Sequence, residues 1–597
     1  MKTLHQIRIA AAVPVVRVAD PATNAWRIIA LMEQAAQSGA QIVVTPELSV
    51  TGASCGDLFG QRPLQKAALA ALKQIVDATK VLNVTAVVGM PLAINRQLCD
   101  VAVVAADGRV ARIVPKSELS SRERRWFSGA DVCEVLLDDS VVEISSAPIA
   151  VDDAVLTLAV GNDVWSAERA ESSEGVIINP FAEPATMGGY ARRKERLMNM
   201  GGSCMSVGAG FGESSTDVAW SGDVLAVVNG EVVAEGRRFS TEGTLTVVDM
   251  AVVKDVRPGE EVATNGESNL LEPYPFIPKC VAESWEAFAI QRAGLMQRLA
   301  SCGIGKCVIG ISGGLDSTLA LLVTVAAYDG LNLCRRDIVG ITMPGFGTTS
   351  RTHTNAVALM RALGITIDEI SIREACLQHF SDIGLPESDR SATYENAQAR
   401  ERTQILMDYA GRIGGIVVGT GDLSELALGW ATYNGDHMSM YGVNAGVPKT
   451  LVKHLVEWYA ESVAEGEVAD ILRDIVDTPI SPELLPADES GNIAQQTEDL
   501  VGPYELHDFF IYNMIAREQA PAEIYAAALK AFEGRYDAAT VKHWLGVFIR
   551  RFFTQQFKRS AVPDGVKVCC VSLSPRTDWH MPSDASSAAW MADWAEL

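Results

Sequence analysis

The sequence predicts an α/β protein with two large domains, and three observations lead to this prediction. The chain has 597 residues, too many to pack around a single hydrophobic core. Through most of its length, short apolar runs alternate with longer amphipathic segments, as strands alternate with helices in α/β proteins. In the second half, the apolar run Cys307–Ile311 passes through a loop of small residues into the apolar segment Thr318–Tyr328. A strand, a tight loop and a helix in this order are typical of a parallel sheet.

The amino-acid composition excludes several functional classes. Hydrophobic residues make up 48% and charged residues 21% of the chain, which are ordinary values for a folded protein. The formal net charge of -24 argues against nucleic acids and anionic membranes as partners. The sequence shows no N-terminal signal and no apolar run of about 20 residues. The 11 cysteines show neither a disulfide framework nor a zinc-binding spacing, so we expect a cytoplasmic enzyme with reduced thiols.

Residues 1–256 are expected to form the first domain, in which strands and helices alternate before two hairpins. Ile7–Val13 has the apolar, β-branched character of a strand, and Pro14 ends it. Asn24–Gln37 has the periodicity of an amphipathic helix. The other expected elements are the strands Gln41–Val44 and Val84–Gly89, the helix Leu64–Lys80, and hairpins that turn at Asp107-Gly108 and Asn229-Gly230.

A linker is expected at residues 257–280, followed by a second domain over residues 281–597. The segment Arg257–Lys279 contains four prolines, an Asn-Gly pair and several acids, which is the composition of a loop. The helix Ala282–Ala300 is then expected to open the second domain.

The loop Ser312–Ser317, with the sequence SGGLDS, has the features of a phosphate-binding loop. It brings backbone N–H groups and a helix N-terminus to one point, and its glycines let a ligand approach the backbone closely. A Walker A loop would carry Gly-Lys-Ser/Thr, whereas this loop carries Asp316, a carboxylate able to hold Mg²⁺ against phosphates. A tight turn without a ligand is the alternative. The motif resembles that of the ATP pyrophosphatases, which split ATP into AMP and pyrophosphate.

Later segments narrow the choice of substrate. Asn396, Arg400 and Gln404 recur every four residues on a predicted helix, Ala392–Gly415, with Thr393 as its expected N-cap. Further characteristic segments are Ile416–Thr450, Asp477–Pro486, Thr497–Phe510 and Arg551–Ser560. Together they resemble the synthetase domain of the long, glutamine-dependent NAD synthetases, and the resemblance covers about residues 280–585.

The resemblance implies a doubly wound parallel sheet of the ATP-pyrophosphatase type, also called adenine nucleotide alpha hydrolase-like. In that family the domain uses ATP to adenylate the nicotinate carboxylate of deamido-NAD, and ammonia then displaces AMP to give NAD. By resemblance, the ATP-binding residues would be Ser312, Gly313, Gly314, Leu315, Asp316, Ser317, Thr420 and Lys449. Deamido-NAD would contact Asn396, Glu425, Trp430 and Lys558, and Mg²⁺ would bind Asp316 and Glu425. Taken singly, Trp430 is more typical of a core residue and Lys558 of a solvated charge.

The first domain resembles the nitrilase-like amidase of the same family, an αββα sandwich. That amidase releases ammonia from glutamine with a Glu base, a Lys and a Cys nucleophile. The base falls on Glu47 in VVTPELSVTG and the lysine on Lys116 in IVPKSELSS, and Gly212–Asp223 matches a later family signature. The strand that should lead to the cysteine reads LAVGNDVW, which places Gly161 at the cysteine position.

Two further positions depart from the amidase pattern. Arg122 stands where the family has a tyrosine, and Glu183 stands where a serine should meet glutamine. Because glycine has no nucleophilic group and Glu183 adds negative charge, we predict an inactive amidase domain and an NAD synthetase that uses free ammonia. The expected partners are ATP, deamido-NAD and ammonia, with further copies of the chain in a homo-oligomer.

Three alternatives remain open at this stage. A separate glutaminase docked on the first domain would supply the ammonia. A relocated thiol would restore the amidase, and the candidates are Cys55, Cys99, Cys133 and Cys204. A non-catalytic sensor of NAD metabolites is the alternative from another functional class.

Overall fold

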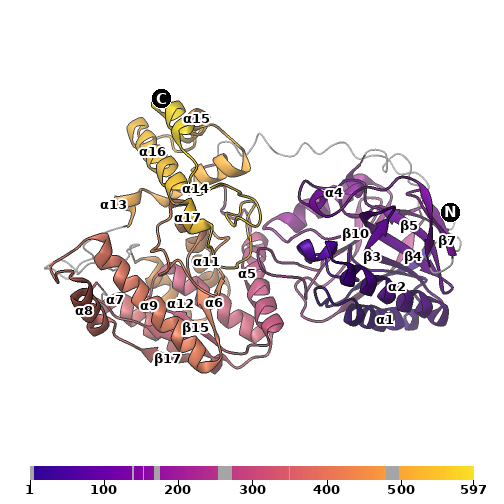
Figure 1. Cartoon of the computed structure of the whole chain (residues 1–597), viewed down its shortest axis with the longest axis horizontal. Coiled ribbons are helices and arrows are strands. Elements are labelled where there is room, and N and C mark those ends of the chain that lie inside the picture. The colour runs from indigo at the N-terminus through magenta and orange to yellow at the C-terminus, as the bar shows by residue number, and fades with distance from the viewer. Residues whose placement is uncertain are drawn as a thin grey trace. The chain divides into compact units, whose positions relative to one another are not determined.

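The computed structural model describes residues 6–137, 140–151, 154–166, 175–252, 272–347, 350–478 and 497–597. The chain forms two compact units, Met1–Ser214 with Ala219–Ala263, and Ser215–Val218 with Thr264–Leu597 (Figure 1). Residues 1–256 are predicted from the sequence to form one continuous domain. In the structure, the short segment Ser215–Val218 belongs to the second unit. Most of the linker predicted at 257–280, and all of Asp477–Pro486 after residue 478, lie outside the described residues.

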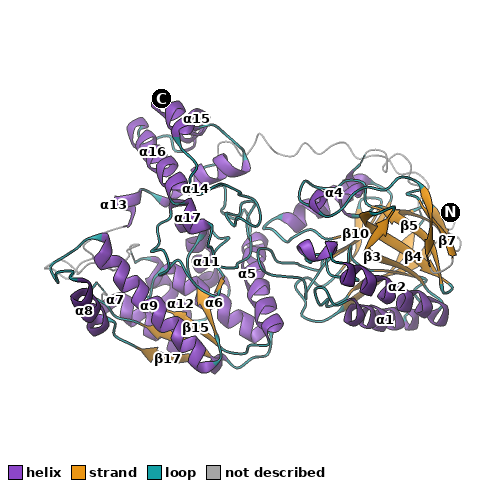
Figure 2. Cartoon of the chain, in the orientation of Figure 1, coloured by secondary structure: helices purple, strands orange, loops and turns teal. Residues whose placement is uncertain are grey.

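The strands of the first unit (Figure 2) form two sheets. Their strand orders are β14-β1-β2-β3-β4-β5-β7-β6 and β13-β12-β11-β10-β9-β8. The strands of the larger sheet are β1 (Gln6–Val13), β2 (Ile42–Val44), β3 (Thr85–Ile94), β4 (Gln97–Ala106), β5 (Arg109–Pro115), β6 (Cys133–Leu137), β7 (Ser140–Ile144) and β14 (Thr244–Ala251). Those of the smaller sheet are β8 (Ile149–Val151), β9 (Ala154–Leu158), β10 (Val176–Phe181), β11 (Ser203–Gly208), β12 (Val224–Val228) and β13 (Glu231–Glu235).

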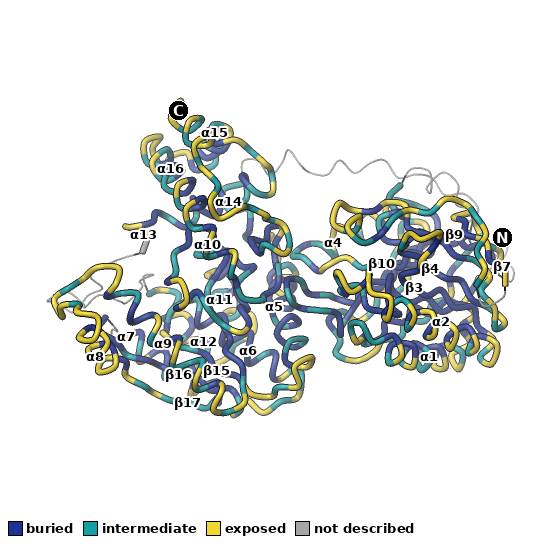
Figure 3. The backbone as a smooth tube through the Cα atoms, viewed as in Figure 1, coloured by how far each residue is buried: buried dark blue, intermediate teal, exposed yellow. Residues whose placement is uncertain are grey.

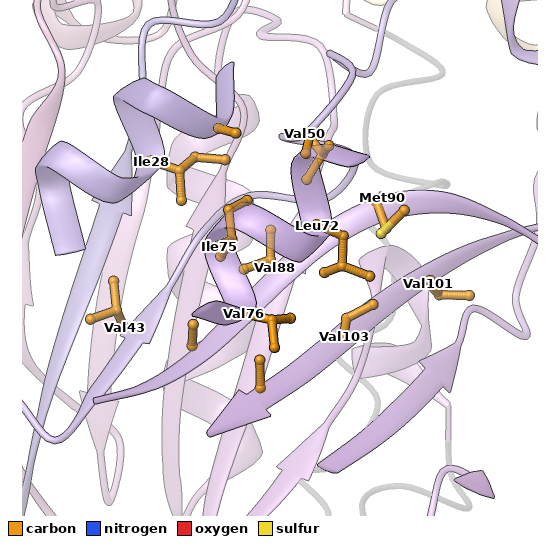
Figure 4. Packing of buried hydrophobic residues seen from close by; sticks show 14 of the residues in the cluster. Ile28, Val43, Val50, Leu72, Ile75, Val76, Val88, Met90, Val101 and Val103 are labelled. Atoms are coloured by element: carbon orange, nitrogen blue, oxygen red, sulfur yellow. The ribbon is translucent and has the colours of Figure 1, made fainter. Parts of the chain in front are cut away.

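Helices cover the outer face of each sheet, while the inner faces pack together. Successive residues of β1 point to opposite faces, so that Ile9 and Ala11 meet the smaller sheet while Ala10 and Ala12 meet the helices. The helices α1 (Pro21–Gln37) and α2 (Arg62–Leu82) bury one apolar face each on the larger sheet (Figure 4). The helix α4 (Gly189–Met200) packs on the smaller sheet. The layers are therefore helix, sheet, sheet and helix, which confirms the predicted sandwich.

The predicted turns and most of the predicted elements of this unit are present, with shifted ends. Asp107-Gly108 joins β4 to β5 and Asn229-Gly230 joins β12 to β13, and all four residues have positive φ, as a tight hairpin turn requires. Helix α1 begins at Pro21 rather than at Asn24, because the Asp20 carboxylate caps it and proline favours the first helical position.

The second unit is built on a five-stranded sheet whose strands all run parallel, in the order β17-β16-β15-β18-β19. The strands are β15 (Cys307–Gly310), β16 (Ile338–Thr342), β17 (Thr366–Glu369), β18 (Ile416–Gly419) and β19 (Tyr441–Gly442). From β15 the chain adds strands first on one side and then, with β18, on the other. The loops that follow β15 and β18 diverge at this switch point, where open α/β sheets bind their ligands.

Helices surround this sheet and continue to the C-terminus. The first eight are α5 (Val281–Cys302), α6 (Leu315–Gly330), α7 (Ser350–Leu363), α8 (Arg373–Ile383), α9 (Ala392–Ile413), α10 (Leu423–Leu428), α11 (Lys449–Ser462) and α12 (Gly466–Val476). The last six are α13 (Thr497–Val501), α14 (Tyr504–Ile511), α15 (Pro521–Ala531), α16 (Ala538–Thr554), α17 (Gln556–Arg559) and α18 (Ala588–Ala595). The strands of each unit are mostly buried, whereas exposed residues lie on the outward faces of the helices and in loops (Figure 3). Among the helices described, none has the length and apolar character needed to cross a membrane.

Candidate active sites

The loop Ser312–Ser317 lies at the carboxyl end of β15, at the switch point of the sheet. Helix α6 begins at Leu315, three residues before the predicted Thr318, so Asp316 and Ser317 lie in its first turn. Gly313 has a φ of +88°, and a Cβ there would lie 2.2 Å from the carbonyl oxygen of Thr352, so only glycine fits. The Ser312 hydroxyl accepts a hydrogen bond of 3.2 Å from the Gly314 N–H. The first N–H groups of α6 and its positive dipole end therefore face the loop.

A cluster of charged residues lies beside this loop. Lys449, the first residue of α11, places its ammonium 2.8 Å from Asp316 Oδ2 and 3.0 Å from Glu425 Oε1. The predicted Mg²⁺ residues Asp316 and Glu425, on α6 and α10, are thus brought together, although 109 positions separate them in the sequence. Lys449, which the resemblance assigns to ATP binding, thus forms ion pairs with both of these acids.

Asp422 belongs to the same cluster and was missing from the sequence-based set. Its side chain has no exposed surface, and its Oδ2 lies 2.6 Å from the Lys449 ammonium. Asp422 also caps α10, because its Oδ1 accepts a 2.9 Å hydrogen bond from the Glu425 N–H while the Glu425 side chain accepts from the Asp422 N–H. The Asp-x-x-Glu pattern of a capping box is the sequence signal for this residue.

Desolvation and mutual charge shift the pKa values in this cluster. Burial raises the pKa of Glu425 to about 7, although the nearby Lys449 ammonium acts in the opposite direction. Burial also raises the pKa of Asp422 well above its usual range. For Lys449, burial favours a lower pKa, but the three carboxylates outweigh it and raise the pKa well above its usual value.

The carboxylates of the cluster have the composition of a divalent-cation site. One oxygen each from Asp316, Asp422 and Glu425 lie within 4.8 Å of one another. Asp316 Oδ1 is buried and has no hydrogen-bond partner among the residues that the structure describes. Asp422 Oδ2 likewise accepts no hydrogen bond from the described residues. Hard oxygen ligands at this spacing, two of them without a hydrogen bond, fit Mg²⁺.

Asn444 joins the two loops that meet at the switch point. It is fully buried, and its side-chain N–H₂ group donates to the carbonyl of Asp316 at 2.9 Å and to that of Thr420 at 3.0 Å. Thr420, a predicted ATP-binding residue, is in this way fixed at the end of β18, next to the SGGLDS loop. Sequence reasoning missed Asn444, because no local pattern marks it.

The residues predicted for deamido-NAD gather around the segment Gly429–Thr432. Lys558 donates to the carbonyls of Gly429 and Ala431, each at 2.7 Å, on either side of Trp430. The Arg551 guanidinium lies 5.2 Å from the centre of the Trp430 ring. Asn396 accepts a 2.8 Å hydrogen bond from the Thr432 hydroxyl. Burial lowers the pKa of the half-buried Lys558, which is therefore not a fully solvated charge.

The N-cap predicted for the helix that carries Asn396 was wrong. Helix α9 begins at Ala392, and the side chain of Ser391, not of Thr393, accepts the capping hydrogen bond. The donor of that bond is the Thr393 N–H.

In the first unit, Glu47 and Lys116 form a buried ion pair. The Lys116 ammonium lies 2.7 Å from Glu47 Oε1 and 2.5 Å from Glu123 Oε1. Glu47 follows β2 and Lys116 follows β5, and both are nearly inaccessible. The nearby Asp100 is also buried, and its pKa is raised well above its usual range by burial and then by the charge of Glu47. Neither Glu123 nor Asp100 had been predicted from the sequence.

Gly161 lies beside this ion pair, at the start of the helical turn Gly161–Trp165 that follows β9. Its φ is +54°, and a Cβ there would lie 2.5 Å from Lys116 Nζ and 2.9 Å from Glu47 Oε2. Asp163 holds the turn in place, because its carboxylate accepts hydrogen bonds from the N–H groups of Ser117 and Glu118. A side chain at position 161 would therefore enter the space that the Lys116 ammonium occupies.

A cavity of about 420 Å³ lies beside the turn that follows β9. Its lining comes from the segment after Lys116 and from the turn after β9, namely Glu118, Leu119, Ser120, Asn162, Trp165 and Ser166.

The two other departures from the amidase pattern have different surroundings. Arg122 is exposed, and its guanidinium lies 6.0 Å from the centre of the Trp126 ring. Glu183 is 49% exposed and lies 2.7 Å from the buried guanidinium of Arg193. The negative charge that Glu183 adds is therefore paired with the Arg193 guanidinium.

The cysteines proposed as relocated nucleophiles pack as apolar side chains. Cys55, Cys99 and Cys204 lie in three separate hydrophobic clusters, and Cys133 packs at the edge of one of them. Burial raises the pKa of the thiols of Cys55 and Cys204 to about 12 and that of Cys99 to about 11. Within the described ranges, none of the hydrogen bonds of these four sulfurs goes to Glu47 or Lys116. A thiol with a raised pKa is a poor nucleophile.

The comparisons with known proteins identify an ATP-dependent ligase that forms a C–N bond. Residues 4–166 match the carbon-nitrogen hydrolase family, and residues 288–541 match the NAD synthase family. The glutamine-dependent NAD(+) synthetase of Mycobacterium leprae is 35% identical to this chain, over 98% of this chain and 97% of that protein. That of Thermotoga maritima is 27% identical over 94% of this chain and 95% of that protein. The chain thus belongs to the family of the glutamine-dependent NAD(+) synthetases, and the alternative of a non-catalytic sensor is not supported.

Solved structures of the same family share the fold. A glutamine-dependent NAD(+) synthetase from Cytophaga hutchinsonii matches with a TM-score of 0.81 and 19% identity, over 99% of this chain and 100% of that chain. A second, from Acinetobacter baumannii in complex with ADP, matches with a TM-score of 0.67 and 20% identity, over 97% of this chain and 98% of that chain. The predicted combination of a nitrilase-like domain with an NAD synthetase domain is therefore confirmed.

Proposed function

We propose that the second unit binds ATP at the SGGLDS loop and Mg²⁺ at Asp316 and Glu425, with Asp422 behind them. Support comes from the positive end of α6, from the spacing of the three carboxylates and from the unsatisfied Asp316 Oδ1. Bound Mg²⁺ would neutralise phosphate charge. Deamido-NAD would lie along Asn396 and Trp430, with Lys558 fixing the segment around Trp430. We also propose that the functional division of the chain follows the predicted limits, 1–256, 257–280 and 281–597.

We further propose that the nitrogen donor is free ammonia. The single observation that carries this proposal is Gly161, which has no side chain at the point where Glu47 and Lys116 converge. Glu47 is available as a base and Lys116 as a cation, but in the described part of the chain no thiol is hydrogen-bonded to either of them. An amide nitrogen cannot be displaced by a thioester route without a nucleophile.

The names of the relatives favour the opposite conclusion. Each of them is called glutamine-dependent, so the comparisons do not support ammonia as the donor. This observation favours a second candidate, in which the same synthetase receives nitrogen from glutamine, through a separate glutaminase partner or a relocated cysteine. Homo-oligomerisation stays a prediction.

Steady-state turnover distinguishes these candidates. The purified chain is supplied with ATP, Mg²⁺ and deamido-NAD, and with either ammonium or glutamine, and NAD is measured. Under the ammonia proposal, glutamine supports less than about one hundredth of the ammonium rate, because the nucleophile is absent. A glutamine rate near the ammonium rate contradicts the proposal.

A variant identifies the origin of any glutamine-supported rate. If Glu47→Gln abolishes it while the ammonium rate is unchanged, the amidase site of this chain is active and one of the four cysteines acts there. If Glu47→Gln leaves the glutamine rate unchanged, a contaminating or partner glutaminase supplies the ammonia. A mass increase of the intact chain after incubation with glutamine would reveal a thioester directly.

A further inference from the structure

The charged cluster of the second unit has an inner and an outer side. Asp422 has no exposed surface, whereas the side chains of Asp316 and Glu425 are 24% and 21% exposed. A ligand that enters the site therefore reaches Asp316 and Glu425 first. The Lys449 ammonium lies between the two sides and contacts all three carboxylates.

The two oxygens of the Asp422 carboxylate do different things. Oδ1 accepts the capping hydrogen bond from the Glu425 N–H, and Oδ2 lies 2.6 Å from the Lys449 ammonium. This ion-pair distance is the shortest of the three that the ammonium makes, while its hydrogen bonds go to Asp316 and Glu425. Because α10 is only six residues long, the cap at Asp422 also sets where Glu425 lies.

A conflict arises when a divalent cation binds to Asp316 and Glu425. The Lys449 ammonium contacts the same two carboxylates, so the cation and the ammonium compete for them and repel each other. An ammonium held by Asp316 and Glu425 alone would have to leave its partners in a buried site, which is costly. Asp422 gives it a third partner on the inner side.

We propose that Asp422 is a positioning residue that retains the Lys449 ammonium on the inner side of the site, so that Asp316 and Glu425 are free for the metal ion. This proposal rests on the proposed metal site. Under this proposal the Lys449 ammonium stays in place beside the bound metal ion and next to the SGGLDS loop. The backbone of Lys449 is held independently, because its N–H donates to the Ser424 hydroxyl at 2.8 Å.

The substitution Asp422→Asn separates the two roles of the residue. Asparagine is as good an N-cap as aspartate, so the helix start is kept while the charge that faces Lys449 is lost. The matched control is Asp508→Asn. Asp508 is another buried carboxylate of the same region and accepts hydrogen bonds from the Ser424 and Thr450 hydroxyls and from the Thr450 N–H.

Mn²⁺ binding to the full-length, nucleotide-free chain, measured by electron paramagnetic resonance, tests the proposal through a double-mutant cycle. Asp422→Asn is expected to weaken Mn²⁺ binding about tenfold, because Lys449 then competes more strongly for Asp316 and Glu425. Lys449→Met is expected to tighten binding. In the Lys449→Met background, Asp422→Asn is expected to change the affinity less than about threefold. The control Asp508→Asn should leave the affinity within the same limit.

The other possible results would each contradict either the positioning role of Asp422 or the proposed metal site. An equal loss from Asp422→Asn in both backgrounds means that Asp422 acts as a metal ligand or as a simple charge, and it overturns the positioning role. Unchanged affinity in Asp422→Asn also overturns it, while the metal site itself stands. If the wild-type chain binds no Mn²⁺, the proposed metal site is wrong and the inference fails with it. Thermal unfolding of all variants shows whether each one is folded.

Discussion

At the scale of single residues, position 161 is constrained by its neighbours. We expect that Gly161→Cys neither restores glutamine hydrolysis nor folds as stably as the wild type. The residue has a φ of +54°, and a Cβ would lie 2.5 Å from the Lys116 ammonium, which Glu47 and Glu123 hold in place. Backbone strain and the displaced ion pair should lower the free energy of unfolding by about 1–3 kcal/mol. Urea denaturation and a glutaminase assay measure the two effects.

The control for this substitution is Gly129→Ala. Gly129 does not have positive φ, and a Cβ added there would have no atom within 4 Å, so the free energy of unfolding should change by less than about 0.5 kcal/mol. A Gly161→Cys protein that is as stable as this control, or that hydrolyses glutamine, would show that the Lys116 side chain can move away at little cost in free energy.

Lys116 is expected to matter for stability more than an exposed lysine does. Lys116→Met leaves Glu47 and Glu123 without their shared cation in a buried site, which should cost about 3–5 kcal/mol of unfolding free energy. Lys194→Met removes a pair with Glu235 in which both side chains are more than 30% exposed, and it should cost less than about 1 kcal/mol. Urea denaturation compares the two. Similar losses would contradict the assignment of a buried, coupled ion pair.

At the scale of elements, the conformation of the SGGLDS loop requires glycine at position 313 more strictly than at position 314. Gly313→Ala should lower the free energy of unfolding by about 1–3 kcal/mol, because its φ is +88° and its Cβ would meet the Thr352 carbonyl at 2.2 Å. At Gly314 the φ is −88° and the nearest atom would be the Ser312 hydroxyl at 3.4 Å, so Gly314→Ala should be milder. Thermal unfolding compares the two variants, and an equal loss would contradict this account of the loop.

Element types followed from the sequence more reliably than element ends. The buried strands and the two hairpins were predicted because their periodicity and turn residues are local signals. Helix starts were missed where the cap was not recognised. Gly314 is the N-cap of α6, so this helix begins three residues before the predicted Thr318. In α9 the N-cap is Ser391 rather than Thr393. A cap depends on which side chain reaches a free N–H group, and several neighbouring residues can do so.

The candidate sites could be predicted only where a motif carries them. Asp316 and Glu425 follow from family segments, but the contact of Lys449 with both of them joins residues far apart in the sequence. Arg193 pairs with Glu183 and Glu123 pairs with Lys116 in the same way. Side chains that are far apart in the sequence and meet only in the folded chain have no characteristic spacing, so a single sequence does not reveal their contacts.

At the scale of the whole molecule, a neutral nucleophile implies a pH dependence. If NH₃ is the attacking species, kcat/KM for total ammonium should rise about tenfold for each pH unit below the pKa of ammonium, because the free base increases by that factor. Initial rates of NAD formation at several pH values and low ammonium measure this slope. A flat profile would indicate that ammonium itself binds or that another step limits the rate.

The segment Ser215–Val218 is an integral part of the second unit. Asp217 accepts hydrogen bonds from the Ser574 hydroxyl at 2.7 Å and from Arg576 Nε at 3.0 Å, and the backbone of Gly565 bonds to Thr216. Asp217→Ala should therefore destabilise the second unit by about 2–4 kcal/mol. Asp470→Ala, which removes a highly exposed pair with Arg473, should have little effect. Calorimetry compares the unfolding temperatures of the two variants, and equal effects would contradict the anchoring.

This arrangement has a consequence for how the gene can change. Four codons of the ligase half lie upstream, within the region that encodes the amidase-like half, so no single truncation yields a complete ligase. Deleting the upstream region would remove Asp217, one of the two carboxylates that pair with Arg576. We therefore expect selection for NAD synthesis to retain these four codons, whether or not the region around them still encodes a working hydrolase.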